Sequence, residues 1–454
     1  MPLKGLIFVG LFLLCAGGAL VLPYLGVYGY IADYCIGPAS QWWEAPFSGL
    51  GIRYSLTLAL TTAIGMLLQS DKLRFGESFL QRQEALMLVF LGIVWLSVFL
   101  EDETVGRYTT VDHPSVKFTK IVVFALMMTH IITDKRKLDG LLWVFVIVSL
   151  ILGLQAWDLP RRAFEGGRLE GIGGADFAES NFFAAFMAAM LPIIGMQLLR
   201  SKWFGKAVCA VSAAFTANAI VLCRSRGALV GIAAGAITAC LFAPKKHRKK
   251  IAVGLMLGIM GGFYVSDPQF LERAATIMRN EDQRDESAVS RLQLWRAGAE
   301  MFADNPFGIG IGNWYQTIEY YLPGHVRKDS HNTYVKCAAE LGVQGILVYV
   351  LFIFTAFLQL RRVRKLSATL PQSVGDDLVL YSFGLTISLA IILTCGITIT
   401  MIYIEIIWLL LMLPVCLRRV LENAVADHEV AVTIETGESG SKTSAQSSEN
   451  SDNQ

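Results

Sequence analysis

Long apolar segments recur along almost the whole chain, and they constrain its fold more than any other feature. Segments long enough to cross a bilayer lie near residues 5–22, 51–69, 84–100, 118–133, 141–157, 180–199, 206–223, 226–243, 251–266, 336–360, 377–400 and 402–417. Hydrophobic residues make up 54% of the 454 and charged residues only 17%, whereas about a quarter of a soluble domain is charged. We therefore predict an all-α fold, a polytopic transmembrane bundle of about twelve helices.

Short basic linkers indicate how this bundle is oriented. Linkers 71–82, 134–137, 201–206, 245–250 and 361–365 all carry Lys or Arg, and the predicted spans place all five on one side of the membrane. Short cytoplasmic loops of membrane proteins carry an excess of Lys and Arg. We therefore expect the amino terminus to be cytoplasmic, and an even number of spans puts the carboxyl terminus on the same side.

The remaining chain consists of one long loop and a polar tail. We assign residues 1–421 to a single membrane domain, whose loop 267–330 lies on the outer side and is partly helical. The tail 422–454 is rich in Ser, Glu and Gly. Because such a composition buries too little apolar surface to offset the entropy of ordering, we predict a disordered cytoplasmic tail.

Arginines on the outer side run against this preference for basic residues inside. They are Arg161, Arg162 and Arg168 between the fifth and sixth spans, Arg224 and Arg226 in the turn after the seventh, and Arg291 and Arg296 in the long loop. A cluster of outer cations needs an anionic ligand to account for it. Ser225 as a helix N-cap would place Arg226 in the first turn of the next span. Snorkelling to the interface is the alternative for Arg226, but we expect a site role.

The loop contains one predicted amphipathic helix, from about residue 287 to residue 304. Its apolar side chains repeat at helical spacing at Val289, Leu292, Trp295, Ala299 and Phe302. Arg291 lies one turn before Trp295. A solvated helix charge is the alternative for Arg291, and we favour that interpretation for Arg296.

Two ionisable residues flank the start of the tenth span. His331 precedes it directly, and a histidine can exchange a proton near neutral pH; capping the helix is the alternative. Glu340 is a costly carboxylate inside an apolar segment. For Glu340 we favour a local pair with Lys336, or a hydrogen bond to another helix, over a catalytic role.

Three patterns do not indicate a ligand. The segment Gly308-Ile309-Gly310-Ile311-Gly312 looks like a phosphate loop, but no strand–helix context surrounds it, so we predict a turn after Pro306. The acidic run 281–286 is interspersed with arginines and is typical of a solvated loop. The eight cysteines show neither a disulfide framework nor a CxxC pattern. No set of metal ligands emerges, and we expect no metal and no cofactor.

Taken in order, these residues resemble the O-antigen ligase and O-antigen polymerase superfamily of bacterial inner-membrane enzymes. The resemblance covers roughly residues 168–345. It rests on Arg168 with Gly171 and Asn181; on Ser225-Arg226-Gly227; on Ser290-Arg291 with Trp295 and Asn305-Pro306-Phe307-Gly308-Ile309-Gly310; and on His331-Asn332-Thr333-Tyr334 followed by Glu340-Leu341-Gly342 and Gly345.

The resemblance implies a fold like that of the C-type glycosyltransferases and a metal-independent, inverting transfer. The donor would be a glycan on undecaprenyl diphosphate, the acceptor lipid A–core, and the active site periplasmic. By similarity Arg226 and Arg291, with Arg168, would hold the diphosphate, and His331 would deprotonate the acceptor hydroxyl. Supporting positions would be Arg161, Arg162, Asn181, Arg224, Trp295, Asn332, Tyr334 and Glu340.

The chemistry of these residue types agrees with that implication. Guanidinium groups can stabilise the charge that develops on a departing diphosphate, and a neutral imidazole can act as a general base. A repeat-unit polymerase and a protein O-oligosaccharyltransferase share the donor and differ in the acceptor, a glycan or a protein. An anion transporter is the alternative outside this class, although no internal repeat is visible. The expected partners include membrane lipids and no nucleic acid.

Overall fold

The computed structural model describes residues 3–41, 43–47, 49, 51–100, 113–160, 164, 167–266, 268, 270–271, 286–325 and 328–449. These residues form helices and no strand, which confirms the all-α fold. The helices are α1 (Leu3–Ala19), α2 (Pro23–Ile36), α3 (Tyr54–Leu68), α4 (Arg82–Ser97), α5 (Pro114–Ile131), α6 (Lys135–Asp158), α7 (Ser180–Arg200), α8 (Trp203–Cys223), α9 (Arg226–Phe242), α10 (Arg248–Val265), α12 (Glu286–Asp304), α13 (Trp314–Tyr321), α14 (Thr333–Leu366), α15 (Gln372–Cys395) and α16 (Glu405–Glu449).

Seven helices in the described part of the chain are long and apolar enough to cross a membrane: α4 to α8, α14 and α15. The number becomes eight if α9 and α10, which bend by 112° at the break between them, form one span. The polytopic bundle is therefore confirmed; seven or eight helices meet the length and composition of a span, where the sequence predicts about twelve spans. α1 and α3 have only 17 and 15 residues. At their rise per residue they extend about 25 and about 22 Å, less than the roughly 30 Å of a bilayer core.

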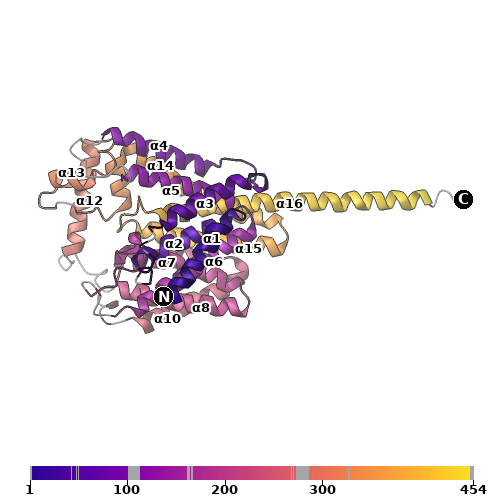
Figure 1. Ribbon diagram of the computed structural model, residues 1–454, viewed down its shortest axis with the longest axis horizontal. Helices are drawn as coiled ribbons and strands as arrows, with labels where there is room; N and C mark the ends of the chain where they lie inside the picture. Colours follow the sequence, from indigo (N-terminus) through magenta and orange to yellow (C-terminus); the bar gives the residue numbers. More distant parts are fainter. Residues whose placement is uncertain are drawn as a thin grey trace.

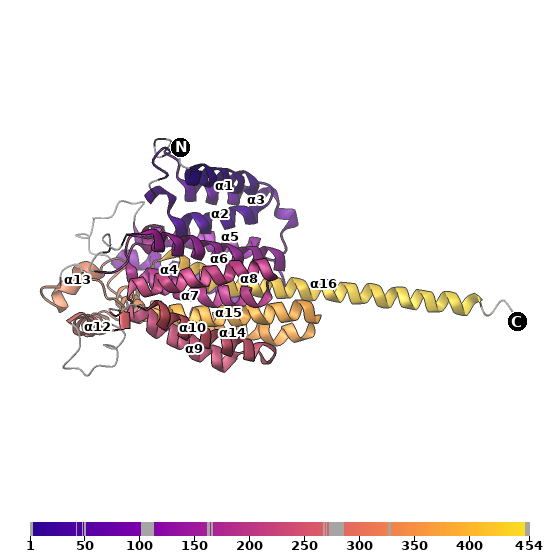
Figure 2. The same cartoon turned by 90° about the horizontal axis from the view of Figure 1, so that it is seen from below.

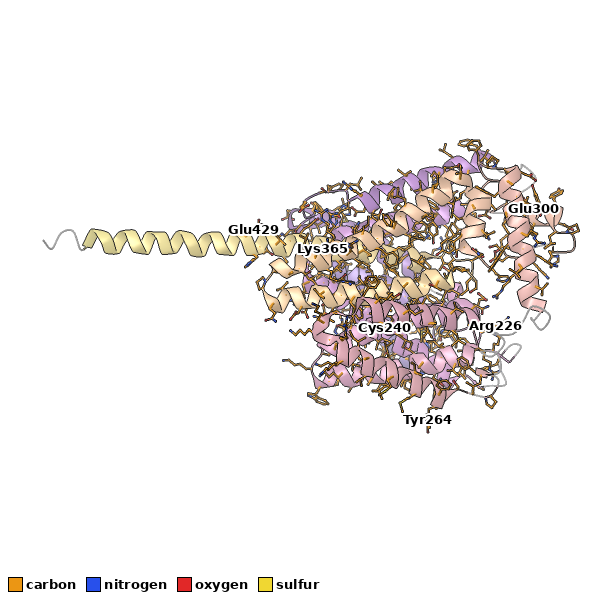
Figure 3. All side chains as sticks on the ribbon, turned by 180° about the vertical axis from the view of Figure 1, so that it is seen from behind. Arg226, Cys240, Tyr264, Glu300, Lys365 and Glu429 are labelled. Carbon is orange, nitrogen blue, oxygen red and sulfur yellow. The ribbon has the colours of Figure 1, made fainter. Side chains whose placement is uncertain are left out.

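The helices lie side by side along one common direction, so the bundle has two distinct ends (Figures 1 and 2). α12 and α13 gather at one of them, which we call the loop end. α16 leaves the opposite end, which we call the tail end. Arg226 and Glu300 lie at the loop end, whereas Lys365, from one of the basic linkers, lies at the tail end (Figure 3).

The amino-terminal helices do not run as the sequence predicts. α1 lies parallel to α3, since Phe8 contacts Tyr54 at the start of α3, with ring centroids 5.1 Å apart, and Ala19 lies against Gly65 near its end. α3 leads to the tail end, where Lys72 and residues of α16 line one pocket. The sequence predicts that both ends of the chain share a side, but α1 begins at the loop end, opposite the end from which α16 leaves (Figure 2). The cause is α2, a helix of 14 residues that no long apolar run indicates and that adds one pass.

Three glycines let α9 pack closely on α15. Gly227, Gly231 and Gly235 recur every fourth residue on one face of α9. A Cβ atom added at Gly231 would lie 2.4 Å from the sulfur of Cys395, and one added at Gly235 would lie 2.5 Å from Ile391. Small residues in this pattern allow helix backbones to approach each other inside membranes. This contact fixes the helix that begins with Arg226.

Gly231→Ala should therefore destabilise the protein, by about 1–3 kcal/mol, because the added methyl group overlaps α15. The matched control is Gly92→Ala in α4, where a Cβ atom would meet no other atom within 4 Å, so the better helix propensity of alanine should leave stability equal or slightly higher. Thermal unfolding of the detergent-solubilised variants measures both effects. Equal midpoints for the two variants would contradict the close packing.

α14 is broken near its start, and a loop segment fills the break. Gly342 has φ 68° and ψ −167°, which no helix contains. The backbone N–H groups of Ile309 and Gly310 donate to the carbonyls of Ala339 and Glu340 at 3.0 and 3.1 Å. A Cβ atom on Gly308 would lie 2.5 Å from the Glu340 carbonyl oxygen. The glycine-rich segment thus supplies hydrogen-bond donors to carbonyls that the break in α14 leaves without helical partners.

The same segment begins with the predicted turn. α12 ends at Asp304, and the N–H of Gly308 donates to the carbonyl of Asn305 at 2.9 Å. The prediction of a turn around Pro306 is therefore confirmed, as is the amphipathic helix before it, which begins at Glu286 in place of about 287.

The polar tail begins within α16. α16 continues as a helix to Glu449, where the sequence favours disorder from residue 422. Its first tail residues are held by charge: Glu422 accepts a hydrogen bond from Arg418 at 2.6 Å, and Asp427 accepts two from Arg74 at 3.1 and 2.8 Å. These contacts extend the helix past the membrane domain.

Candidate functional site

Arg168 joins three chain segments at the loop end. Its Nη2 donates to Oδ1 of Asn181 in the first turn of α7 at 2.7 Å, and its Nε donates to the carbonyl of Cys223, the last residue of α8, at 3.0 Å. The hydroxyl of Ser225 donates to the same Asn181 oxygen at 3.0 Å. Asn181 therefore sets the position of Arg168 relative to the start of α9.

The turn between α8 and α9 carries the next two arginines. Arg224 ends α8 in the left-handed conformation, φ 49° and ψ 41°, and its Nη1 donates to the carbonyl of Gly167 at 2.5 Å. Ser225 caps α9 by accepting the N–H of Ala228 at 3.4 Å, as predicted. Arg226 is the first residue of α9 and is half-buried. Arg224 thus holds the loop, whereas Arg226 stands at the helix start.

α12 is fixed to the bundle through Trp295. The indole N–H of Trp295 donates to the carbonyl of Ser330 at 3.0 Å. Leu294 and Met301 of α12 are buried against Trp314 of α13 in a small separate core. Arg291, one turn before Trp295, is thereby held close enough to His331 to affect its charge. The structure brings these two predicted site residues together.

His331 is held in a strained backbone conformation. Among the described residues other than glycine, only Arg224 and His331 have positive φ, which is 48° at His331. Such a conformation costs of order 1–3 kcal/mol and persists only where the neighbours impose it. Here Ser330 is bonded to the Thr400 hydroxyl at 2.8 Å, and the N–H of Thr333 donates to the carbonyl of Gly396 at 2.8 Å. Both sides of His331 are therefore locked.

His331 is not the helix cap that the sequence offered as its alternative role. Asn332 caps α14, because its Oδ1 accepts the N–H groups of Tyr334 and Val335 at 2.9 and 3.1 Å. The hydroxyl of Tyr334 donates to the carbonyl of Leu393 at 2.8 Å. Asn332 and Tyr334 therefore shape the start of α14, and the imidazole of His331 is left for other contacts.

The surroundings of His331 favour its neutral form. Burial lowers its pKa below 6.5, and the positive charge of Arg291 lowers it further. The carboxylates of Asp329 and Glu179 act in the opposite direction without reversing the shift. A lowered pKa leaves the imidazole unprotonated near pH 7, which is the state that a general base needs.

Glu179 and Asp329 are two site residues that the sequence reasoning missed. Oε1 of Glu179 accepts a hydrogen bond from Asn181 at 2.5 Å, and its charge acts on His331, so it links the Arg168 group to the histidine. Asp329 accepts Lys336 at 3.0 Å and the hydroxyl of Tyr315 at 3.1 Å. The only signal in the sequence was a carboxylate two residues before His331.

Asp329 stays ionised beside the histidine. Burial raises its pKa, but the charge of Lys336 and hydrogen bonds from Thr400 and Lys336 outweigh burial, and the net pKa is lowered. Lys336 also lies over the ring of Tyr315, 4.2 Å from its centroid. The positive charge of Lys336 therefore compensates the negative charge of Asp329.

Glu340 has hydrogen-bond partners from other elements, one of the two arrangements that the sequence favours, and it does not form an ion pair with Lys336. It is fully buried, and its two oxygens accept the N–H of Trp314 at 3.3 Å and the hydroxyl of Tyr403 at 2.7 Å. The lysine pairs with Asp329 instead. Of the two expected arrangements, the hydrogen bond to another element is the one that forms.

The remaining predicted positions either lie outside the described residues or are exposed. Arg161 and Arg162 lie outside the described residues, as do positions 281–285 of the acidic run. Arg296 is exposed, which agrees with a solvated helix charge. Within the described part of the chain, no three His, Cys, Asp or Glu side chains gather as metal ligands would. Arg168, Arg226, Arg291 and His331 remain the candidate site residues, and their residue types can hold an anion and accept a proton.

Arg291→Gln should raise the pKa of His331, because it removes a positive charge that lowers it. Diethyl pyrocarbonate modifies neutral imidazole, so the modification rate of the peptide containing His331, followed against pH by mass spectrometry, reports this pKa. In the unmodified protein the midpoint should lie below that of an unperturbed imidazole, and in Arg291→Gln it should move to higher pH. Arg296→Gln on the same helix is the control and should leave the midpoint unchanged. An unmoved midpoint in both variants would show that Arg291 does not act on His331.

Part of the chain that forms this site matches a known protein family. Residues 211–350 match the family described as O-antigen ligase. The match begins within α8 and ends within α14, so it contains Arg226, Arg291 and His331, whereas Arg168 and Asn181 precede it. No curated protein matches the chain. The match confirms the superfamily resemblance and supports an activity of the O-antigen ligase or polymerase type.

Proposed function

From the match of residues 211–350 to the O-antigen ligase family, we propose that this protein transfers a glycan from undecaprenyl diphosphate to an acceptor hydroxyl at the loop end, on the periplasmic side of a bacterial inner membrane. The observation that carries the proposal is the strained His331 at the loop end, where the charge of Arg291 and burial lower its pKa, together with the Asn181 group that positions Arg168 and the start of α9. These residues come from four separate segments of the chain.

The arginines would hold the diphosphate of the donor. Each guanidinium is permanently charged and presents its N–H groups in a planar fork that matches phosphate oxygens. Arg168 is already positioned by Asn181 and by the Cys223 carbonyl, so it costs little to order on binding. As the bond between the sugar C1 and the diphosphate oxygen breaks, negative charge grows on the leaving group, and fixed cations stabilise that charge more than they stabilise the bound donor.

His331 would act as the general base. The acceptor oxygen attacks C1 of the donor sugar, its proton passes to the neutral imidazole, and the diphosphate leaves with the electron pair of the broken bond. A single displacement of this kind inverts the anomeric centre. A positioned base contributes typically about 10²–10⁴-fold to the rate. Asp329 and Glu179 are the carboxylates that would stabilise the imidazolium after proton transfer.

Lipid A–core is the acceptor that we favour, as in a ligase. A repeat-unit polymerase, which uses a growing glycan, and a protein O-oligosaccharyltransferase would need the same donor residues. An anion transporter fits less well, because transporters hold their substrates near the middle of the membrane, whereas the site residues here gather at one end of the bundle. The basic linker at Lys365 lies at the opposite end (Figure 3), which supports a cytoplasmic tail end.

Arg226→Ala and Arg291→Ala should each abolish transfer, because each removes a cation from the departing diphosphate. Losing one such interaction costs about 10²–10³-fold in rate. The assay incubates purified protein with a lipid diphosphate-linked oligosaccharide and candidate acceptors and identifies the product by mass spectrometry. Arg296→Ala is the matched control, an exposed arginine of α12 that should retain activity. Normal transfer by either of these two variants would refute the proposal that the arginines hold the diphosphate.

His331→Ala should lose turnover while keeping donor affinity, because the histidine acts on the acceptor and not on the diphosphate. Donor binding is measured with a fluorescent lipid diphosphate-linked sugar, and turnover with the transfer assay. Weakened donor binding at full stability would instead assign His331 to the diphosphate site. Transfer should also persist in EDTA, and loss of activity restored by a divalent cation would contradict the metal-independent mechanism.

A further inference from the structure

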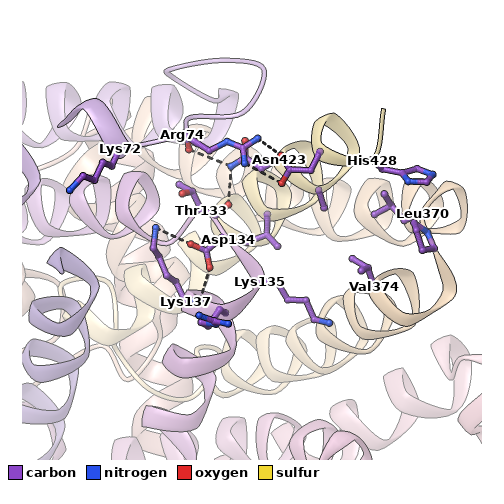
Figure 4. A pocket seen from close by; sticks show the side chains of 15 residues that line it. Lys72, Arg74, Thr133, Asp134, Lys135, Lys137, Leu370, Val374, Asn423 and His428 are labelled. Carbon is purple, nitrogen blue, oxygen red and sulfur yellow. Dashed lines mark hydrogen bonds and ion pairs between the residues drawn. The ribbon is translucent and has the colours of Figure 1, made fainter. Parts of the chain in front are cut away.

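A pocket of about 580 Å³ lies at the tail end, away from the proposed active site. Figure 4 shows the side chains that line it. Its walls come from the linker after α3, the turn between α5 and α6, the turn before α15, and α16. Asn423 of α16 ties these walls together, since its side-chain amide donates to the carbonyls of Thr133 at 2.9 Å and Arg74 at 3.4 Å. The pocket is therefore preformed, and its volume lies within the range of small-molecule sites.

The lining of this pocket is strongly cationic. Five Lys or Arg side chains face two carboxylates, Asp134 and Asp427. Arg74 pairs with Asp427, and Lys137 pairs with Asp134 at 2.9 Å. These two pairs use both carboxylates of the lining, so an excess of positive charge is left over.

The remaining cations of the lining are Lys72, Lys135 and Arg136. Lys135 is paired with Asp377, outside the lining, at 2.5 Å. Lys72 donates to the neutral Gln69 amide oxygen at 2.7 Å. Within the described part of the chain, Arg136 has no hydrogen bond or ion pair. Two cations without a carboxylate partner thus line a concave surface, where an anion would be attracted.

Part of the pocket lining is aliphatic, and we call this part the floor. Leu370 and Val374 come from the turn and start of α15, and Val420 and Ala424 from α16. Leu370 and Val420 are buried. A site with cations on the walls and aliphatic side chains on the floor matches a ligand that has a phosphate next to a hydrocarbon portion.

Basic residues at a cytoplasmic membrane surface are expected in any membrane protein, and that rule alone explains cations such as Arg361, which is exposed on α14 and does not line the pocket. It does not explain why cations from segments some sixty residues apart converge on one preformed hollow with an apolar floor. Convergence of this kind is typical of binding sites for anionic lipid headgroups between membrane helices.

We propose that this pocket binds a phosphate-bearing anion, and that its occupant is the headgroup of an anionic phospholipid. Lys72 and Arg136 contact the phosphate, and the apolar floor accommodates the glycerol and the first methylene groups. A soluble phosphate compound shares the anionic chemistry but makes no use of the floor. The site is independent of the proposed transfer reaction.

The test uses the full-length protein, delipidated in detergent, and fluorescent phosphatidylglycerol as the probe. Arg136→Gln and Lys72→Gln should each weaken binding about five-fold, the effect of losing one Lys or Arg contact with an anionic headgroup. The matched control is Arg361→Gln, which removes the same charge at the same end outside the pocket and should bind as the unmodified protein does. Fluorescent phosphatidylcholine should bind weakly to all variants. Thermal unfolding confirms that each variant is folded.

Competition separates the two sources of phosphate. Inorganic pyrophosphate that displaces the lipid only at concentrations far above that of phosphatidylglycerol supports the lipid assignment. Tight pyrophosphate binding that is weakened by Arg136→Gln, without preference for phosphatidylglycerol over phosphatidylcholine, would overturn that assignment in favour of a soluble ligand. Equal binding of both probes by Arg136→Gln, Lys72→Gln and Arg361→Gln would overturn the site altogether.

Discussion

The break in α14 is the constraint on which the loop end depends. In an unbroken helix the N–H of Val343 would bond to the carbonyl of Ala339, but at Gly342 the chain turns away and that bond is lost. The N–H of Val343 donates instead to the carbonyl of Pro306 at 2.9 Å, while Ile309 takes the Ala339 carbonyl. Backbone groups inside an apolar bundle must be paired within the protein, and the segment after α12 supplies the partners at this break, which holds α12 and α13 at the loop end.

Anchoring of α12 then determines the electrostatics of the proposed base. Trp295 reaches the Ser330 carbonyl, which brings Arg291 next to His331 and sets the charge state of the imidazole. The strained backbone of His331 is tolerated because Ser330 and Thr333 are each bonded to the segment between α15 and α16. Local strain, helix anchoring and pKa therefore have a common origin in tertiary contacts.

Cationic side chains gather at both ends of the bundle, but their surroundings differ. At the loop end two carboxylates lie among the cations. Glu179 accepts a hydrogen bond from Asn181, and Asp329 pairs with Lys336, so negative charge there partly offsets the positive charge of the arginines. At the tail end, five Lys or Arg side chains and several aliphatic side chains line one pocket (Figure 4). The same residue types thus suit a reacting diphosphate at one end and a resident headgroup at the other.

The sequence by itself determined the all-helical membrane class, because long apolar runs leave few other structures, and it determined the local features: the Ser225 cap, the turn at Pro306 and the helix after residue 286. It also singled out Arg226, Arg291 and His331 as residue types suited to the chemistry. Only the tertiary structure decided the rest. α2 has only 14 residues and is too short to be seen as a pass, so the course of the amino-terminal helices was missed. Lys336 pairs with Asp329, and Glu340 instead accepts the N–H of Trp314 at the start of α13. Pairings between distant segments depend on packing geometry, which the order of residues along the chain does not record.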